Sequence, residues 1–379
     1  MRTLSKIILA MTCGTATSAI AQTDLSSGES RANARYAQTF GVTVQEAEGR
    51  LARRREIGAL NARLEQEQAD TFGGMYVEHG PVYRVVVRFT ADSAATLARY
   101  TQDPLFVPEA AAVTVREMVS TQRRVYDLLK ALNIESASQV RVSSGRVEFF
   151  VADPAAAQAL VAAGTLAVPS YVTFGRAVDL SPEREGNAEG GRPLSGGVCT
   201  SGYVVFNTST RTRYLLTAGH CGHTGTAMTY NGVTLPRAGS KYEPGTSYDY
   251  QWHTAPGFTL TNLIYEGFAT PLRITAVWPR ANMVEGDFIC KWGNATGYTC
   301  GNIVTKQYDL LGHPGFVLVR DINGVDLSRG GDSGGPWYYD SYNEAWGIHT
   351  DNGRENPNDA VFMPIEYISA SGLAVLTTQ

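Results

Sequence analysis

The chain has little excess charge of either sign. Its 379 residues include 32 lysines and arginines against 36 aspartates and glutamates, which gives a formal net charge of −4. Proteins that hold nucleic acid through its phosphates carry clustered positive charge. The composition therefore argues against nucleic acid as a partner, and a content of 43% hydrophobic residues is typical of an ordinary globular protein.

Long hydrophobic runs are missing as well. The apolar run Ile7–Met11 is far shorter than the roughly 20 residues that cross a bilayer, and no other segment approaches that length. The run follows Arg2 and Lys6 and leads to the small residues Ala19-Ile20-Ala21. This order is typical of a secretory signal peptide, so we predict a signal at residues 1–21, cleaved before Gln22, and no membrane partner. The alternative is a buried N-terminal helix.

Cysteine is scarce, with five in the whole chain. Cys13 leaves with the signal, and the four that remain are Cys199, Cys221, Cys290 and Cys300. An even number in an exported chain indicates disulfides, and four cysteines allow three connectivities. Pairing sequence neighbours would close two short loops, each worth on the order of 3 kcal/mol. The alternative is a metal site built from Cys199, Cys221, His220 and His223, but it lacks the C-x-x-C spacing of structural zinc sites. We expect no metal and no cofactor.

The length favours two domains, and the pattern of the chain changes near residue 187. In the first half, helical and strand patterns alternate, which is typical of an α+β domain. Thr43 and Glu46 form a capping box at the start of the first helix. We expect helices at 43–69, 115–133 and 154–164, a strand at 82–90, and a hairpin at 139–152 that turns at 143–145.

The stretch Ser181–Pro193 is polar, rich in glycine and without periodicity, so it is predicted to be a linker. After it come many short β-rich runs separated by turns, which indicate an all-β sandwich or barrel with one short helix near the C-terminus. The expected domains are the signal at 1–21, the α+β region at 22–186 and the β region at 187–379.

Two motifs in the β region carry the chemistry. Serine is a poor nucleophile unless a histidine takes its proton and an acid orients that histidine. The stretch YLLTAGHCG presents His220 after a strand that ends in small residues, and RGGDSGGPW presents Ser333 among glycines. The glycines allow the amides of Gly331 and Ser333 to point together at one oxygen. Between the motifs, YDYQWH supplies Asp249 in aromatic company.

These motifs, TAGHC, DYxW and GDSGGP in that order, resemble the chymotrypsin-like serine peptidases, and their spacing resembles the bacterial branch with streptogrisins and α-lytic protease. The first half is similar to the pro-region of that branch at FGVTVQEAEGRL and YRVVVRFT. The resemblance implies two six-stranded antiparallel β-barrels, with the site in the cleft between them, preceded by an α+β pro-region.

The resemblance also assigns roles. It makes His220 the general base and acid, Asp249 its orienting group, Ser333 the nucleophile, and the amides of Gly331 and Ser333 the oxyanion hole. It implies the disulfides Cys199–Cys221 and Cys290–Cys300. Bacterial relatives pair the acid before the serine with an arginine that follows a cysteine; Lys291 stands there in this chain. We therefore predict an ion pair between Lys291 and Asp332.

The specificity pocket is the least determined part of the site. Its expected lining is Leu327, Ser328, Arg329, Gly330, His349, Thr350, Asp351 and Asn352, with the region near Val361 and Phe362. Leu327 replaces the aspartate that gives trypsins their basic preference, which argues against cleavage after lysine or arginine. His349 resembles the histidine of glutamate-specific members, and Arg329 could reinforce it. An acidic preference is therefore one prediction, and a small or apolar preference is the alternative.

The resemblance implies a secreted or periplasmic, monomeric endopeptidase that acts on peptides or proteins. Its pro-region would assist folding and inhibit the enzyme until cleavage, and the mature chain would begin within Gly186–Gly190. An α/β-hydrolase, suggested by the G-x-S-x-G match, is disfavoured because both partners precede Ser333. The other alternative is a catalytically inactive binding protein with a peptidase fold, although the motifs lack none of the catalytic residues.

Overall fold

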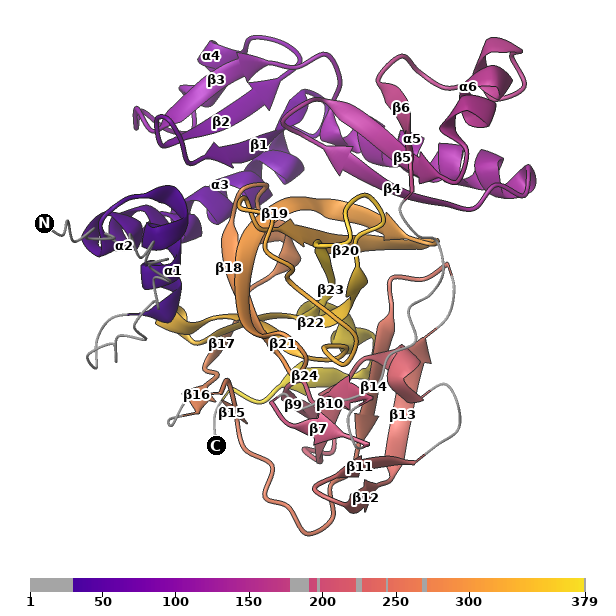
Figure 1. Ribbon diagram of the computed structural model, residues 1–379. Coiled ribbons are helices and arrows are strands. Elements are labelled where there is room, and N and C mark those ends of the chain that lie inside the picture. The colour runs from indigo at the N-terminus through magenta and orange to yellow at the C-terminus, as the bar shows by residue number, and fades with distance from the viewer. Residues whose placement is uncertain are drawn as a thin grey trace, which may run out of the picture.

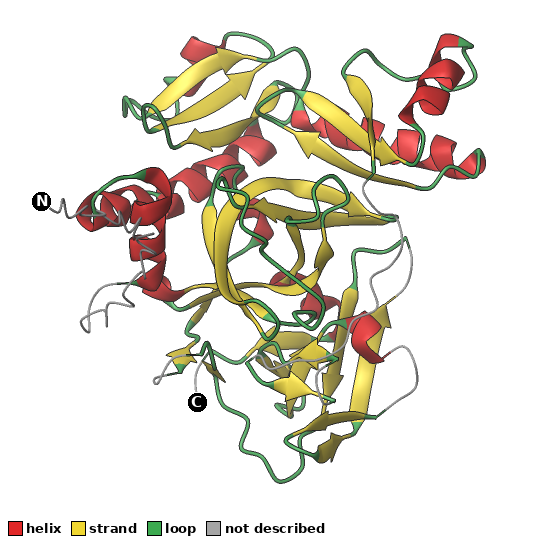
Figure 2. Cartoon of the chain, in the orientation of Figure 1, coloured by secondary structure: helices red, strands yellow, loops and turns green. Residues whose placement is uncertain are grey.

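The computed structural model describes residues 30–177, 191–195, 198–222, 227–242, 245–267 and 271–377. Figure 1 shows an α+β region stacked on a β region, and Figure 2 shows that most helix belongs to the former. The predicted signal, the window for the mature start and most of the linker Ser181–Pro193 lie outside the described residues. No helix in the described ranges is long and apolar enough to cross a membrane.

The α+β region contains the same order of elements twice. Its first part has α1 (Arg31–Phe40), α2 (Val44–Ala52), α3 (Arg54–Glu67), β1 (Phe72–Glu78), β2 (Arg84–Phe89), α4 (Ser93–Leu97) and β3 (Phe106–Ala110). Its second part has α5 (Val115–Ala131), β4 (Ser136–Arg141), β5 (Arg146–Val151), α6 (Pro154–Ala162) and β6 (Val172–Arg176). In each part, a helix precedes an antiparallel pair of strands. A second helix then leads to a third strand, which runs parallel to the second strand of the pair.

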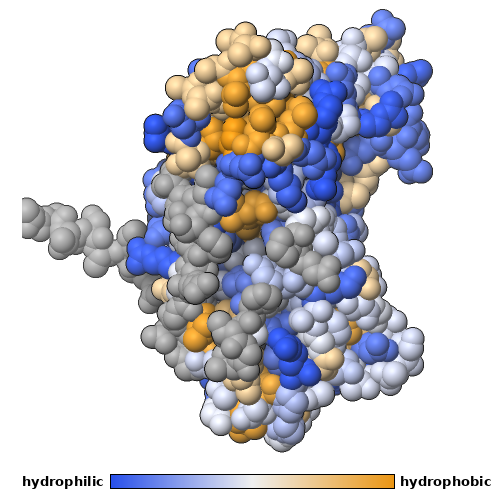
Figure 3. All heavy atoms as spheres, turned by 90° about the vertical axis from the view of Figure 1, so that its right-hand side faces the viewer, coloured by the Kyte–Doolittle hydropathy of each residue, from blue (hydrophilic) through white to orange (hydrophobic). Residues whose placement is uncertain are grey.

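The α+β region has its own hydrophobic cores. Val85, Val87 and Phe89 of β2 are fully buried against α3, while Val125 and Leu129 of α5 are buried against β4 and β5. Figure 3 views the molecule from the right-hand side of Figure 1. It shows hydrophobic residues gathered near the top of this surface, in the region that carries α6 in Figure 1.

The first half of the β region forms two sheets. The first sheet has the order β13-β14-β10-β9-β24 and the second the order β12-β11-β7-β8. The strands are β7 (Pro193–Leu194), β8 (Cys199–Thr200), β9 (Val204–Asn207), β10 (Arg213–Thr217), β11 (Met228–Tyr230), β12 (Val233–Leu235), β13 (Arg237–Tyr242), β14 (Asp249–His253) and β24 (Leu373–Val375). The 3-10 turn η1 (Gly219–Gly222) follows β10.

The second half closes into a six-stranded barrel. Its order is β18-β21-β22-β23-β20-β19, and β18 pairs with β19 to complete the circle. The strands are β18 (Phe288–Gly293), β19 (Gly297–Leu310), β20 (His313–Arg320), β21 (Pro336–Tyr339), β22 (Glu344–Asn352) and β23 (Ala360–Pro364), with β17 (Ala276–Val277) added beside β22. The remaining short elements are β15 (Leu263–Ile264), β16 (Leu272–Arg273), η2 (Arg280–Asn282), η3 (Asp340–Tyr342) and η4 (Ile365–Ser371).

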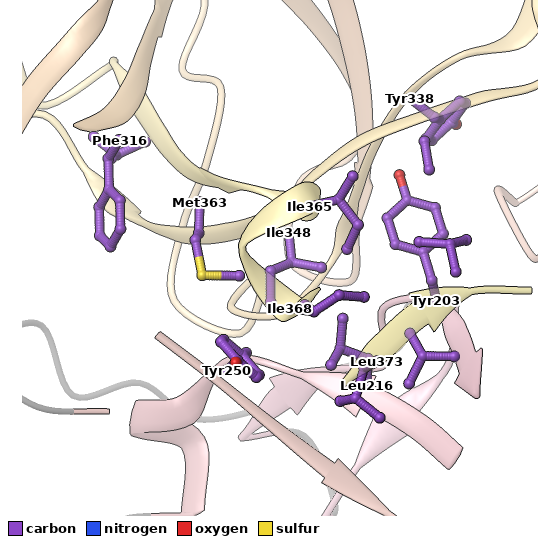
Figure 4. Packing of buried hydrophobic residues seen from close by; sticks show 14 of the residues in the cluster. Tyr203, Leu216, Tyr250, Phe316, Tyr338, Ile348, Met363, Ile365, Ile368 and Leu373 are labelled. Carbon is purple, nitrogen blue, oxygen red and sulfur yellow. The ribbon is translucent and has the colours of Figure 1, made fainter. Parts of the chain in front are cut away.

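A shared core joins the two halves of the β region. Leu216 and Tyr250 come from the first half, and Ile348 and Met363 come from the barrel; all four are fully buried in one cluster. Figure 4 shows these side chains together with Ile368 of η4, which precedes the return of the chain to β24. This core fixes the relative position of β10, β14 and the barrel, and thereby of the residues at their ends.

The α+β region is joined to the barrel by a continuous sheet. β4 pairs antiparallel with β19, where Tyr308 is opposite Gln139 and Asp309 is opposite Ser138. Beside this pairing the Thr305 hydroxyl donates to the carbonyl of Val140 over 2.6 Å. The barrel sheet thus continues into β4, β5 and β6.

The structure differs from the sequence expectation at the N-terminal helices. The helix expected at 43–69 is divided into α2 and α3, because the amide of Arg53 bonds to the carbonyl of Arg50 and the helical ladder shifts there. Thr43 accepts from the amide of Glu46, but the Glu46 carboxylate pairs with Arg50 instead of completing the capping box. Helix α1, capped by the Ser30 hydroxyl, was not anticipated from the sequence.

The disulfide between β18 and β19 offers a test of the barrel. Cys290 and Cys300 are bonded and lie opposite each other in the strand pair, 10 residues apart in sequence. We expect the double substitution Cys290→Ala and Cys300→Ala to lower the free energy of unfolding by about 3 kcal/mol, because the unfolded chain regains loop entropy. Urea denaturation of variant and wild type measures the difference, and equal midpoints would contradict the expectation.

Candidate active site

His220 is placed by the turn that follows β10. The residue lies in η1, and the next residue, Cys221, is disulfide-bonded to Cys199. A side chain on Gly219 would collide with the backbone of Tyr250 and with Asp249, so only glycine lets η1 approach β14 this closely. The small residues before His220 therefore serve to bring it against the strand that carries the acid.

Asp249 begins β14 and is 1% exposed. Its Oδ2 lies 2.8 Å from His220 Nδ1, and its Oδ1 accepts the backbone amide of His220 over 2.9 Å. Burial alone would raise the pKa of Asp249, but the charge and hydrogen bonds of His220 hold it below its ordinary value. A carboxylate in this position keeps the proton of the imidazole on Nδ1 and leaves Nε2 as an acceptor.

Ser333 meets that acceptor. Its Oγ lies 2.8 Å from His220 Nε2, so imidazole, carboxylate and hydroxyl form one hydrogen-bonded chain. On either side of Ser333, Gly331 and Gly334 have φ angles of 102° and 87°, which only glycine adopts readily. The carbonyl of Gly331 accepts from the Thr200 hydroxyl over 2.7 Å, which fixes the peptide before the serine.

Asp332 is held from several sides inside the barrel. Its Oδ2 lies 2.8 Å from Lys291 Nζ, and both side chains are fully buried. The Thr296 hydroxyl donates to Oδ2 over 2.5 Å, and the amide of Ala295 donates to Oδ1 over 2.8 Å. Burial alone would raise the pKa of Asp332, but the Lys291 charge lowers it. Neither Ala295 nor Thr296 was anticipated from the sequence, because a turn that offers amides has no distinctive residue pattern.

The expected pocket residues fall into two groups. Leu327 is fully buried in the barrel core, and the Ser328 hydroxyl donates to Asn352 Oδ1. Arg329, in contrast, has a 69% exposed side chain that pairs with Asp326 over 2.7 Å, so the structure places its guanidinium at the rim beside an acid. Asp351 pairs with Arg354 over 2.6 Å. Gly330 is partly exposed and Thr350 is buried.

His349 lies on β22, a strand of the six-stranded barrel. Its imidazole is 1% exposed and lies near the indole of Trp337, with ring centroids 6.4 Å apart. Nδ1 has no hydrogen-bond partner among the described residues. Burial, supported by the charge of Lys291, lowers the pKa of His349 to about 3, so the ring is neutral in ordinary buffers.

The ligand set considered for a metal comes together only in part. Atoms of Cys199, His220 and Cys221 lie within 4.8 Å of one another, but the two sulfurs are joined in a disulfide and offer no thiolate. His223 lies outside the described residues. His253 is buried and contacts the carbonyl of Leu235 and the side chain of Gln251.

A curated protein is similar to most of this chain. No protein-family model matches the chain. Streptogrisin-C of Streptomyces griseus is 26% identical over 360 residues, which cover 89% of this chain and 73% of that protein. The chain is similar to this protein over most of its length. Its triad geometry and this relative together indicate a serine endopeptidase.

Several solved structures are similar to about half of this chain. Cellulomonas bogoriensis chymotrypsin is 24% identical and covers 52% of this chain and 98% of its own, with a TM-score of 0.38. Protease A of Thermobifida fusca is 27% identical and covers 50% and 98%, with a TM-score of 0.40. A glutamic acid-specific serine protease that uses a histidine triad in substrate binding is 24% identical and covers 50% and 98%, with a TM-score of 0.39. Overlaps with TM-scores this low carry no argument about substrate or mechanism.

The buried ion pair gives a prediction with a defined pH dependence. We expect Lys291→Met to lower the free energy of unfolding by about 3 to 5 kcal/mol at neutral pH, because Asp332 then remains as an unpaired buried carboxylate. Burial would raise its pKa above the unfolded value of about 4. Stability is then lost as pH rises through the window between the unfolded and the raised folded pKa. The variant should be more stable at pH 5 than at pH 7, as measured by denaturant unfolding at each pH.

Lys291→Arg is the matched control, because it keeps the positive charge at the same position. It should retain the wild-type pH profile and peptidase activity, whereas Lys291→Met should lose activity. A methionine variant as stable as wild type at neutral pH, or fully active, would contradict the role of the ion pair.

Proposed function

We propose that the protein is a secreted serine endopeptidase made as a preproenzyme. The observation that carries the proposal is the position of His220, whose ring nitrogens each lie 2.8 Å from a partner, Asp249 on one side and Ser333 on the other. A hydroxyl, an imidazole and a carboxylate in this order are the groups that acyl transfer from a peptide bond requires.

The proposed reaction has two steps. His220 Nε2 takes the proton of Ser333 as Oγ attacks the scissile carbonyl, and then gives that proton to the departing amine, which leaves an acyl-enzyme. Water enters, loses a proton to His220 and attacks the acyl carbon; the bond to Ser333 Oγ then breaks, His220 returns the proton to Oγ, and the carboxylic acid product leaves. Asp249 stays ionised and stabilises the imidazolium in both steps.

The amides of Gly331 and Ser333 are proposed to stabilise the tetrahedral oxyanion. Asp332, fixed by Lys291 and the turn at Ala295, supports the loop that presents the two proposed donors. In this proposal the ion pair acts by positioning and touches no substrate.

We propose residues 1–21 as the signal, 22–186 as the pro-region and 187–379 as the catalytic domain. The two disulfides fit an oxidising compartment such as the cell exterior or the periplasm. The β4–β19 pairing supports a pro-region that assists folding and inhibits, because it completes a sheet with the barrel before any cleavage. The mature chain would start within 186–190, act as a monomer and take peptide or protein substrates, with no cofactor.

Ser333→Ala tests the catalytic proposal. We expect at least a 10⁴-fold lower kcat for peptide hydrolysis, because the nucleophile is gone, and no labelling by a fluorophosphonate that labels the wild-type enzyme. Ser209→Ala is the control, since Ser209 is exposed in the turn between β9 and β10 of the catalytic domain and should leave both readouts unchanged. Wild-type protein that hydrolyses nothing and takes no label after pro-region removal would favour the inactive binding protein.

The same variant tests maturation. N-terminal sequencing of secreted wild type and Ser333→Ala should show a start within 186–190 only for wild type, if the enzyme cuts its own pro-region. Identical trimming of both would show that another protease performs the processing.

We propose an acidic preference at the residue before the cut, based on His349. Its Nδ1 is buried without a hydrogen-bond partner in the described part of the chain, and the ring is neutral because its pKa is about 3. A neutral imidazole can donate one hydrogen bond to a carboxylate but supplies no charge. The pairing of Arg329 with Asp326 leaves His349 as the main candidate for this contact.

Peptides that differ only at this residue provide the measurement. We expect kcat/KM to be higher for glutamate than for glutamine or leucine, and His349→Ala to lower the value for glutamate by about 10- to 100-fold, the effect of one hydrogen bond to a charged group. The leucine peptide is the internal control and should change little. Equal values for the three peptides would remove the acidic preference in favour of a small or apolar one.

A further inference from the structure

An arginine of the α+β region lies inside a set of aromatic rings on the barrel. Arg54, in the first turn of α3, is 3% exposed. Its guanidinium carbon lies 3.8 Å from the ring centre of Tyr339, 4.7 Å from that of Trp346 and 5.0 Å from that of Trp278. Tyr342 follows at 5.6 Å. These four rings with the carboxylate of Glu344 are called the aromatic cage below.

The polar contacts of Arg54 are few. Its Nη2 donates to Glu344 Oε2 over 2.6 Å, while Nε and Nη1 have no hydrogen-bond partner among the described residues. The guanidinium is therefore held by one carboxylate and by ring faces, an arrangement that cation–π attraction favours when water is excluded. Arginine suits such a site better than lysine because its planar group stacks on rings.

The residues of the aromatic cage all belong to the β region: Tyr339 and Trp346 lie on β21 and β22, Trp278 follows β17, and Tyr342 lies in η3. β17 pairs parallel with β22, and the amide of Trp278 donates to the carbonyl of Ala345 over 2.9 Å. The indoles of Trp278 and Trp346 stack, with centroids 5.4 Å apart and planes at 15°. Figure 1 shows α1, α2 and α3 along the side of the barrel that carries β17 and β18. All four rings and Glu344 therefore belong to the β region, and the Tyr339 hydroxyl also donates to Asn33 Oδ1 of α1.

Removal of α3 would leave the carboxylate of Glu344 without its two arginine partners. Glu344 is 2% exposed and pairs with Arg54 and also with Arg55, whose Nη2 lies 2.7 Å from Oε1. Loss of both arginines leaves a buried carboxylate without a countercharge, which is costly. It also exposes aromatic faces that had been covered by a planar cation. The aromatic cage then offers one acid and several ring faces to a guanidinium from outside.

We propose that the aromatic cage is a guanidinium-binding exosite. Arg54 fills it in the precursor, and an arginine side chain of a polypeptide substrate fills it in the processed enzyme. The second half of the proposal rests on the proposed proteolytic function. Glu344 and His349 lie on the same strand, β22, five residues apart, which corresponds to roughly 16 Å. A substrate that reaches the aromatic cage would thus be held at a second point beyond the cleft.

Binding can be tested in the full chain, without hydrolysis. In a Ser333→Ala background, Arg54→Ala opens the aromatic cage while α3 remains in place. Acetyl-argininamide should then raise the thermal midpoint of this variant and change its tryptophan fluorescence with saturation. Acetyl-citrullinamide, the neutral isostere, should do neither. If Arg54→Ala does not fold alone, refolding with acetyl-argininamide should recover soluble protein where acetyl-citrullinamide does not.

Two variants serve as controls. Arg55→Ala removes the exposed partner of Glu344 but keeps Arg54 in the aromatic cage, so acetyl-argininamide should have no saturable effect on it. Adding Glu344→Gln to Arg54→Ala should abolish the response. An absent response to acetyl-argininamide, or an equal response to the citrulline compound, would overturn the exosite.

The processed enzyme tests the natural occupant. Glu344→Gln should raise KM severalfold for a protein substrate, leave kcat unchanged, and have no effect when the arginines of that substrate have been converted to citrulline. An enzyme that cleaves both substrates with an unaltered KM would overturn the substrate role alone. An enzyme that cleaves neither would instead overturn the proposed function, so the two failures are distinguishable.

Discussion

The hydrogen bonds of Asp249 to His220 constrain the whole β region. The carboxylate begins a strand of the first half, whereas Ser333 belongs to a loop of the barrel, and the imidazole must touch both. The two halves therefore have to be packed to within a few tenths of an ångström. The shared core of Leu216, Tyr250, Ile348 and Met363 provides that fit, because close-packed side chains resist relative sliding.

The second constraint is the barrel interior beneath Ser333. A charged pair is buried there, Lys291 with Asp332, and its cost is offset by the Thr296 hydroxyl and by amides of the same turn. The disulfide between Cys290 and Cys300 joins the two strands that carry this turn. The loop with the catalytic serine thus rests on a polar cluster that is itself enclosed by covalently linked strands.

The sequence predicted the convergence of His220, Asp249 and Ser333 because serine catalysis requires these three groups together, and the glycines and small residues around them permit close approach. It also predicted the alternation of helix and strand before residue 187 and the short strands after it. It did not predict the break at Arg53, which depends on how α2 and α3 pack. The aromatic cage was missed because Trp278, Tyr339 and Trp346 come from separate segments of the chain, and Arg54 is one of three consecutive arginines, a residue type that is usually exposed.

The β4–β19 pairing has a consequence for the solubility of the separated parts. β19 is 14 residues long and extends past the barrel, so at Tyr308 and Asp309 its outer backbone groups bond to β4. Detachment of β4 would turn this stretch into an open sheet edge, which invites pairing with another molecule. Lys306 and Asp309 are charged residues of opposite sign near that edge. Charged side chains along an edge strand disfavour its pairing with the same strand of a second molecule.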